Sequence, residues 1–253
     1  MNTKTFDSIE ELMKYITQEN WRDYIFRGQS NENWLLESTL SRKLREISKI
    51  TQQEKEKLIE KHYSLFNSNI RGKLKFIPKT LSDDERLALG QHYGLITPLL
   101  DFTTSPYIAI FFAFITEPLT EPVTDYRIVW CIDKKGITLI NEKHCGKGKP
   151  NLKEMTPEVI DINKRIIAQS ALFYKMPDDT IDIETWINEM AQEEKEKQII
   201  TKMRISNELK KEILEMLDQM NINYNSMYPD LIGASLDCNI RFNKGPNIIA
   251  KTE

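Results

Sequence analysis

The sequence has few cysteines, and none of them has the spacing of a metal site. Cys131, Cys145 and Cys238 stand far apart among 253 residues and form no CxxC pair. An odd number of separated cysteines favours reduced thiols over a disulfide framework. We therefore expect no bound metal and a cytoplasmic location.

We also expect no leader and no membrane-spanning run, and the sequence has no excess of positive charge. Residues 1–12 carry acidic side chains where a secretory signal needs an apolar core. The longest apolar run, 107–115, is too short to cross a bilayer, so we expect no membrane partner. The net charge of −3 gives no global positive field for nonspecific binding of nucleic acid, although a local basic face stays possible.

The most informative stretch that is present covers residues 91–106, QHYGLITPLLDFTTSP, and leads into the apolar run YIAIFFAF. Ser105 followed by Pro106 is typical of an N-cap with proline at the first helical position. A helix that is apolar on every face should be buried, and its free N-terminal amides can bind an anion. Core packing alone does not require the polar residues that precede this helix. Four of them are therefore candidate site residues: His92, Tyr93, Asp101 and Thr103.

Apolar periodicity and capping signals predict a mixed succession of helices and strands. Helices are expected at 6–17, 51–69, 82–94, 106–114 and 184–198, with others starting near 156, 206 and 228. Asp7 with Glu10 and Ser82 with Glu85 are predicted capping boxes. Strands are expected at 21–28, 127–132, 137–140, 165–174 and 199–205. No convincing linker interrupts the pattern. The sequence therefore predicts a single α+β domain over 1–253, with a core at about 20–242 and a mixed or antiparallel sheet flanked by helices.

A second candidate site residue lies in the first of these strands. Arg27 stands at its end beside Gly28 and Gln29. A guanidinium there can hold a phosphate or diphosphate in a fixed fork geometry, and glycine would let the ligand approach the backbone. The alternative is a structural ion pair, for which Asp101 is a candidate partner.

The other candidates also have structural alternatives. His92 could act as a base or merely cap a helix end, and Tyr93 could stack on a flat ring or belong to the core. Asp101 and Thr103 could line a cleft or make turn hydrogen bonds. Gln169 lies in a predicted apolar strand, where a polar side chain needs a partner if it is buried.

These segments resemble the FRG domain family, which is named for its Phe-Arg-Gly motif. The resemblance extends over nearly the whole chain. It rests on 26–29, 34–36, Ser38, Arg42, 91–94, 99–103, 105–106, 109–113, 228–231 and on Arg165 with Gln169 and Phe173. The family's usual Pro-Thr-Arg before Leu-Leu-Asp is Ile96-Thr97-Pro98 here, so the anionic contact of that arginine is in doubt. The resemblance implies a bacterial anti-phage defence or toxin-like setting.

The order of the motifs is similar, more distantly, to that of ADP-ribosyltransferases. That resemblance implies a split sheet and NAD as cofactor, with Arg27, Gly28 and Gln29 at the diphosphate. It further implies Thr103 and Ser105 at the nicotinamide ribose, Tyr93 beside the ring, Asp101 in the cleft, and His92 and Gln169 in catalytic roles. Gln169 stands where these enzymes carry a glutamate, and glutamine cannot act as a general base.

Three functions follow as hypotheses. The first is an NAD-dependent ADP-ribosyltransferase that modifies nucleic acid or protein. The second is a non-catalytic sensor that binds a nucleotide or nucleic acid in the same cleft, which the missing glutamate favours. The third is a protein-interaction component, which would show a large exposed apolar patch.

Overall fold

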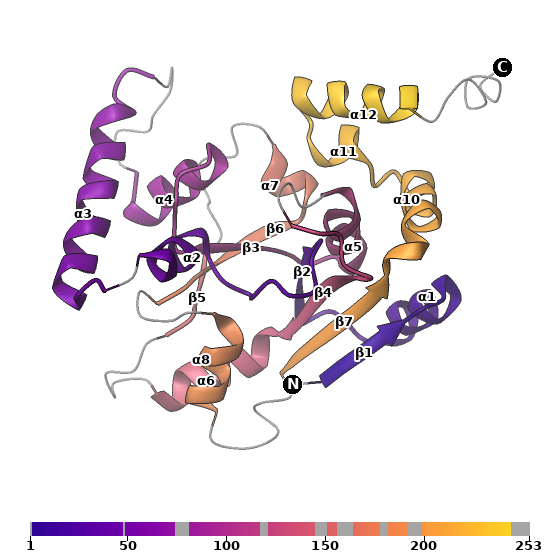
Figure 1. Cartoon of the computed structure of the whole chain (residues 1–253), viewed down its shortest axis with the longest axis horizontal. Helices are drawn as coiled ribbons and strands as arrows, with labels where there is room; N and C mark the ends of the chain where they lie inside the picture. Colours follow the sequence, from indigo (N-terminus) through magenta and orange to yellow (C-terminus); the bar gives the residue numbers. More distant parts are fainter. Residues whose placement is uncertain are drawn as a thin grey trace.

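The computed structural model describes residues 2–47, 49–73, 81–116, 121–144, 151–155, 164–177, 182–191 and 199–243. The strands of this described part form one seven-stranded sheet in the order β1-β7-β4-β2-β3-β6-β5 (Figure 1). Strands β1 and β7 pair in parallel, and all other neighbours pair antiparallel. The predicted α+β class with a mixed sheet is confirmed. The strands are β1 (Asn2–Phe6), β2 (Tyr24–Gln29), β3 (Leu99–Thr103), β4 (Tyr126–Asp133), β5 (Lys153–Met155), β6 (Ala171–Lys175) and β7 (Ile200–Ser206).

Helices flank this sheet, and no helix of the described residues is long and apolar enough to cross a membrane. A 3-10 turn at Asn207–Leu209 precedes α10. The helices are α1 (Ile9–Gln18), α2 (Thr39–Glu46), α3 (Gln52–Asn69), α4 (Asp83–His92), α5 (Pro106–Ile115), α6 (Lys134–His144), α7 (Arg165–Ala168), α8 (Ile183–Met190), α10 (Lys210–Gln219), α11 (Tyr224–Met227) and α12 (Leu231–Asn243).

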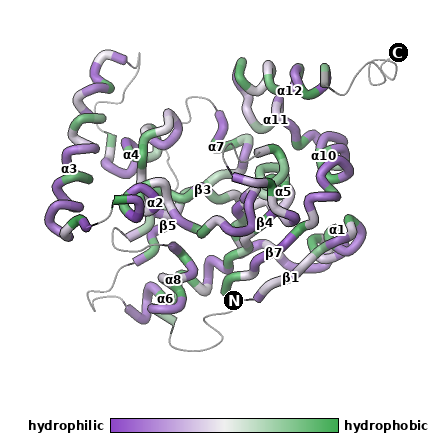
Figure 2. Tube along the Cα trace, in the orientation of Figure 1, coloured by the Kyte–Doolittle hydropathy of each residue, from purple (hydrophilic) through white to green (hydrophobic). Residues whose placement is uncertain are grey.

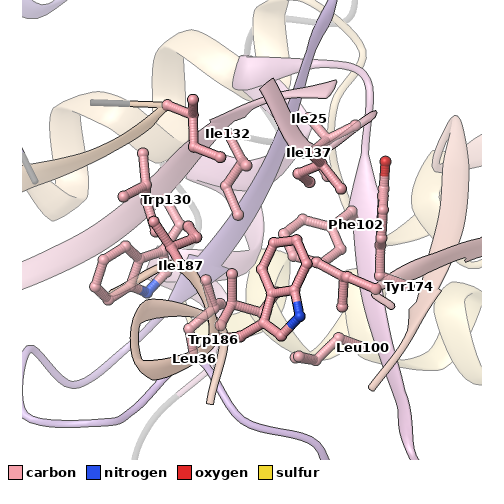
Figure 3. Close-up of a cluster of buried hydrophobic side chains, with 14 of the residues drawn as sticks. Ile25, Leu36, Leu100, Phe102, Trp130, Ile132, Ile137, Tyr174, Trp186 and Ile187 are labelled. Atoms are coloured by element: carbon pink, nitrogen blue, oxygen red, sulfur yellow. The ribbon is translucent and has the colours of Figure 1, made fainter. Parts of the chain in front are cut away.

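One face of the sheet packs against α6 and α8. Trp130 of β4 and Trp186 of α8 are fully enclosed there, together with aliphatic side chains of β2, β3 and β6 (Figure 3). Side chains alternate between the two faces along a strand, so β4 gives Ile128, Trp130 and Ile132 to this cluster. Burial of such large aromatic side chains is a major source of folding free energy.

The opposite face is covered by α1, α5 and α10, with α4 over the β3–β6 end. Helix α5 is buried along most of its length, as predicted, and most of it has the hydrophobic colour in Figure 2. The Ser105 hydroxyl accepts a hydrogen bond from the Ile108 amide at 3.4 Å, and Pro106 opens the helix. The predicted N-cap is therefore confirmed.

Predictions of a helix cap and of a short strand had different outcomes. The predicted capping box at Ser82–Glu85 begins α4, and α3 begins with a capping box at Thr51–Glu54 that was not predicted. The strand predicted at 137–140 is wrong: these residues belong to α6, which buries Ile137 and Ile140 from one helical face.

The start of the chain was also predicted incorrectly. Residues 2–6 form β1, and α1 begins only at Ile9. Its N-cap is Ser8, whose side chain makes no capping bond, so the helix does not begin with the expected Asp7–Glu10 capping box.

The strand predicted at 165–174 is instead α7 followed by β6. Ser170, with a φ of 46°, lies between the two elements. The helix expected near 156 and the second half of the helix expected at 184–198 lie outside the described residues.

Candidate functional site

The sheet is weakly joined between β2 and β3. In the described chain these strands pair at a single position, Phe26 with Thr103, whereas β2 pairs with β4 along its whole length. Just beyond that pair, Arg27 Nη1 donates a hydrogen bond to the backbone carbonyl of Asp101 at 2.8 Å. A side chain therefore links the two strands where the backbone ladder stops.

A cavity of about 570 Å³ lies at this opening of the sheet. Its volume is within the range of small-molecule and cofactor sites. Residues of β2 and β3 line the cavity. In the view of Figure 1, α4 lies to the left of β3 and α5 to its right. Its aromatic lining comprises Phe26, Trp34, Phe102, Phe112, Phe173 and Tyr228.

Positive charge dominates the described lining of the cavity, which holds Arg27, Arg42 and Arg165 against a single carboxylate, Asp101. The Asp101 side chain is half exposed and lies 3.6 Å from Arg27 Nη1. Burial lowers the pKa of the Arg27 guanidinium, and Asp101 raises it. An arginine nevertheless keeps its charge at neutral pH.

Arg27 also retains hydrogen-bonding capacity. Its Nε is buried and has no hydrogen-bond partner among the described residues. A guanidinium has five N–H donors, and the Asp101 carbonyl uses one of them. The arrangement therefore suits an anion with several oxygen acceptors.

Most of the predicted site residues line this cavity. Tyr93 and Ser105 are not among its described lining: Tyr93 is exposed and packs edge-on against the His92 ring, and Ser105 caps α5. The predicted residues that the structure brings together are Arg27, Gly28, Gln29, His92, Asp101, Thr103 and Gln169.

Gly28 has a packing role that the sequence did not reveal. A Cβ at this position would lie 1.9 Å from the Ala109 carbonyl oxygen and 2.6 Å from the Ala113 nitrogen. The space beside its α carbon is thus filled by the backbone of α5 and not left for a ligand. Close contact between helix and strand is therefore one reason for the glycine, and its predicted contact with a ligand stays a prediction.

Gln29 is bound within the framework. Its Nε2 donates to the Leu35 carbonyl at 3.0 Å, and its Oε1 accepts from Trp130 Nε1 at 2.6 Å. The side chain is almost fully buried. Both ends of the amide have partners, which makes Gln29 a support for the cavity wall.

Thr103 and Gln169 stabilise the part of the cavity wall next to α11. The Thr103 hydroxyl donates to the Gln169 carbonyl at 2.7 Å, and Gln169 Nε2 donates to the Met227 carbonyl at 2.9 Å. Gln169 stands in the turn after α7 and not within a strand. Its amide therefore joins the wall to α11, which supplies the partner that a polar side chain needs there.

Sequence reasoning assigned no site role to Arg42, Arg165 or Tyr228, although all three fall in or near the family motifs. The Arg165 guanidinium lies over the Tyr228 ring at 4.9 Å and donates to Asp230 Oδ2 through Nη2 at 2.6 Å and Nε at 3.1 Å. This arginine holds the pKa of Asp230 below its usual range. The pair fastens α7 to the segment before α12.

Replacement of Asp230 by asparagine should lower the free energy of unfolding by about 1 kcal/mol at pH 7. Because the folded pKa of Asp230 is depressed, its contribution is present above the unfolded pKa of about 3.9 and is lost as pH falls through the folded value. Urea unfolding at pH 7 and pH 3 measures the difference.

Asp237→Asn is the matched control, because Asp237 pairs with Arg241 within α12 alone. Such an i,i+4 pair contributes only about 0.3–0.5 kcal/mol. Equal effects of the two substitutions, or an Asp230→Asn effect that is as large at pH 3 as at pH 7, would contradict the assigned role.

Comparison with known proteins adds one finding. A family model described as FRG domain matches residues 22–121. Comparison with curated proteins found no match, and comparison with solved structures found none either. The matched segment carries Arg27, Arg42, His92 and Asp101, whereas the wall formed by Arg165 and Gln169 lies outside it. Residues 22–121 are therefore similar to the FRG domain, and the rest of the chain lies outside the matched segment.

Proposed function

We propose that the cavity binds a nucleotide, and that NAD is the first ligand to test. The observation that carries this proposal is the placement of Arg27, whose guanidinium lines the cavity, closes the gap between β2 and β3 and uses one of its five N–H donors on the Asp101 carbonyl. Guanidinium groups bind phosphate oxygens in pairs, with shorter and stronger hydrogen bonds than neutral donors form.

The rest of the lining supports the same ligand class. Aromatic side chains such as Trp34, Phe112 and Tyr228 offer flat apolar surface for a base. Arg27 and Arg42 provide positive charge in the same space. A ligand with an anionic centre and a flat ring matches this combination better than a wholly apolar or wholly ionic one.

Isothermal titration of the full chain with NAD, ADP-ribose and adenosine tests the proposal. We expect NAD and ADP-ribose to bind roughly 10- to 100-fold more tightly than adenosine, because hydrogen bonds to charged groups contribute about 1.5–3 kcal/mol. Equal affinity for adenosine, or no binding of any of the three, would rule the proposal out.

A second candidate function is transfer of ADP-ribose to a macromolecule, and the carboxylate of Asp101 favours it. In this reaction a nucleophile of the acceptor attacks the ribosyl carbon, the bond to nicotinamide breaks, and a base removes the acceptor's proton. Gln169 cannot accept that proton, because its amide is not basic and is bonded to Met227. Asp101 and His92 are the cavity residues with suitable chemistry.

Incubation with labelled NAD and RNA, DNA or protein separates the two functions. Transfer of label that is lost in Asp101→Asn or His92→Ala, with NAD still bound, would support the transferase. Binding without transfer would support the sensor. An anti-phage or toxin role belongs to the transferase proposal, and growth arrest on expression that requires Asp101 would support it.

A further inference from the structure

Arg42 reaches the cavity because α2 is fastened to the segment before β3. The Leu40 amide donates to the Thr97 carbonyl at 3.0 Å, and the Thr97 amide donates to the Thr39 hydroxyl at 3.1 Å. These bonds fix the first turn of α2. Arg42 follows in that helix and lines the cavity.

Arg42 shares its counter-ion with a second arginine. The buried Glu37 carboxylate accepts a hydrogen bond from Arg45 Nη2 at 2.7 Å, whereas Arg42 Nε lies 3.5 Å from the same oxygen. One carboxylate thus faces two guanidiniums, and Arg45 holds the closer contact. The Nη groups of Arg42 have no hydrogen-bond partner among the described residues, and its side chain is 43% exposed.

Arg27 and Arg42 belong to different elements, β2 and α2, yet line the same cavity. The positive charge of Arg42 also lowers the pKa of Arg27, because two nearby cations repel each other. Each guanidinium retains donors. An anion placed between them would relieve this repulsion and fill those donors.

We propose that Arg27 and Arg42 form a two-guanidinium site for a diphosphate, in which Arg42 determines specificity for two linked phosphates over one. The inference rests on the proposed nucleotide-binding function of the cavity. Each guanidinium fork matches a pair of oxygens, and a diphosphate presents one such pair on each phosphate. A phosphate monoester has three terminal oxygens, so two forks would have to share one of them, whereas a diphosphate offers a separate pair to each.

ADP-ribose and AMP are matched ligands for the test, because both carry close to two negative charges at neutral pH. We expect Arg42→Gln to weaken ADP-ribose and inorganic pyrophosphate about 10- to 100-fold and AMP by no more than about threefold. Titration calorimetry at one fixed, low salt concentration measures these affinities, and thermal melting confirms that each variant is folded.

Arg45→Gln is the control variant. Arg45 lies in the same helix and contacts the same Glu37, but it is not among the described cavity lining. We expect Arg45→Gln to leave the affinity for ADP-ribose within about twofold of the wild type, since its charge lies outside the binding contacts. If Arg42→Gln and Arg45→Gln behave alike, or if Arg42→Gln weakens AMP as much as ADP-ribose, the specificity role is overturned.

The two proposals can fail separately. Tight, Arg27-dependent binding of ADP-ribose that is unaffected by Arg42→Gln overturns the two-arginine site and leaves the nucleotide site intact. Binding of pyrophosphate that depends on Arg42, with no binding of NAD or ADP-ribose, supports the two-arginine site and rejects the nucleotide proposal.

Discussion

Replacement of Gly28 by alanine should lower the melting temperature by roughly 10 °C or prevent folding altogether. The added Cβ would overlap the Ala109 carbonyl oxygen and the Ala113 nitrogen, both of which are backbone atoms of α5. Overpacking a core costs about 1–3 kcal/mol, and more where the backbone must move. For a chain of this size, 1 kcal/mol shifts the melting temperature by about 2–4 °C. Thermal denaturation followed by circular dichroism measures the loss.

Gly90→Ala is the control for this substitution. A Cβ at Gly90 would meet Leu95 Cδ2 at 2.5 Å, which belongs to a flexible side chain that can move. Gly90 also lies within α4, where alanine favours the helix by about 1 kcal/mol. We expect Gly90→Ala to change stability far less. Equal melting temperatures for the two variants would show that α5 can move away from β2 at little cost.

The second large effect is expected for Arg27→Gln, which should weaken ADP-ribose binding about 100-fold or more. The substitution removes a positive charge and a bidentate donor from the centre of the proposed site, and each charge-assisted hydrogen bond contributes about 1.5–3 kcal/mol. Arg27→Lys keeps the charge but loses the fork, so a loss of about tenfold is expected. Titration calorimetry gives both values.

Arg22→Gln provides the control, because Arg22 is exposed, lies just before β2 and does not belong to the described lining. The melting temperature of Arg27→Gln must also be measured, since Arg27 Nη1 joins β2 to the Asp101 carbonyl. An unchanged affinity in a folded Arg27→Gln variant would remove this arginine from the ligand site.

Predictions from the sequence succeeded where a local signal determines the structure. Ser105-Pro106 and the apolar residues after it predicted a capped, buried helix, because capping and burial both depend on neighbouring residues. The capping box at Ser82 is equally local. By contrast, the β-rich stretch at 137–140 favoured a strand, and only packing against the sheet selects the helix that buries Ile137.

Long-range pairing explains what the sequence could not show. Strand β1 has its partner in β7, where Phe6 pairs with Ile205, and no local pattern reveals such a distant partner. The motifs did indicate that Arg27, Asp101 and Gln169 belong together, and they line one cavity. The packing role of Gly28 depends on where α5 crosses β2.

The sequence also could not show which of Arg42 and Arg45 lines the cavity. Both are basic residues of one short helix, three positions apart, and both contact Glu37. Their sequence context gives no reason to prefer either. Arg42 alone of the two is among the described cavity lining, because of the direction in which α2 is fastened to Thr97.

The single backbone pair between β2 and β3 also bears on where the folding unit ends. Both strands lie in the matched segment 22–121, yet β2 finds its long partner in β4 and β3 finds its own in β6. Expressed alone, residues 22–121 would leave two strands with exposed edges, which are templates for aggregation. The segment that defines the family therefore depends on later parts of the chain for its stability.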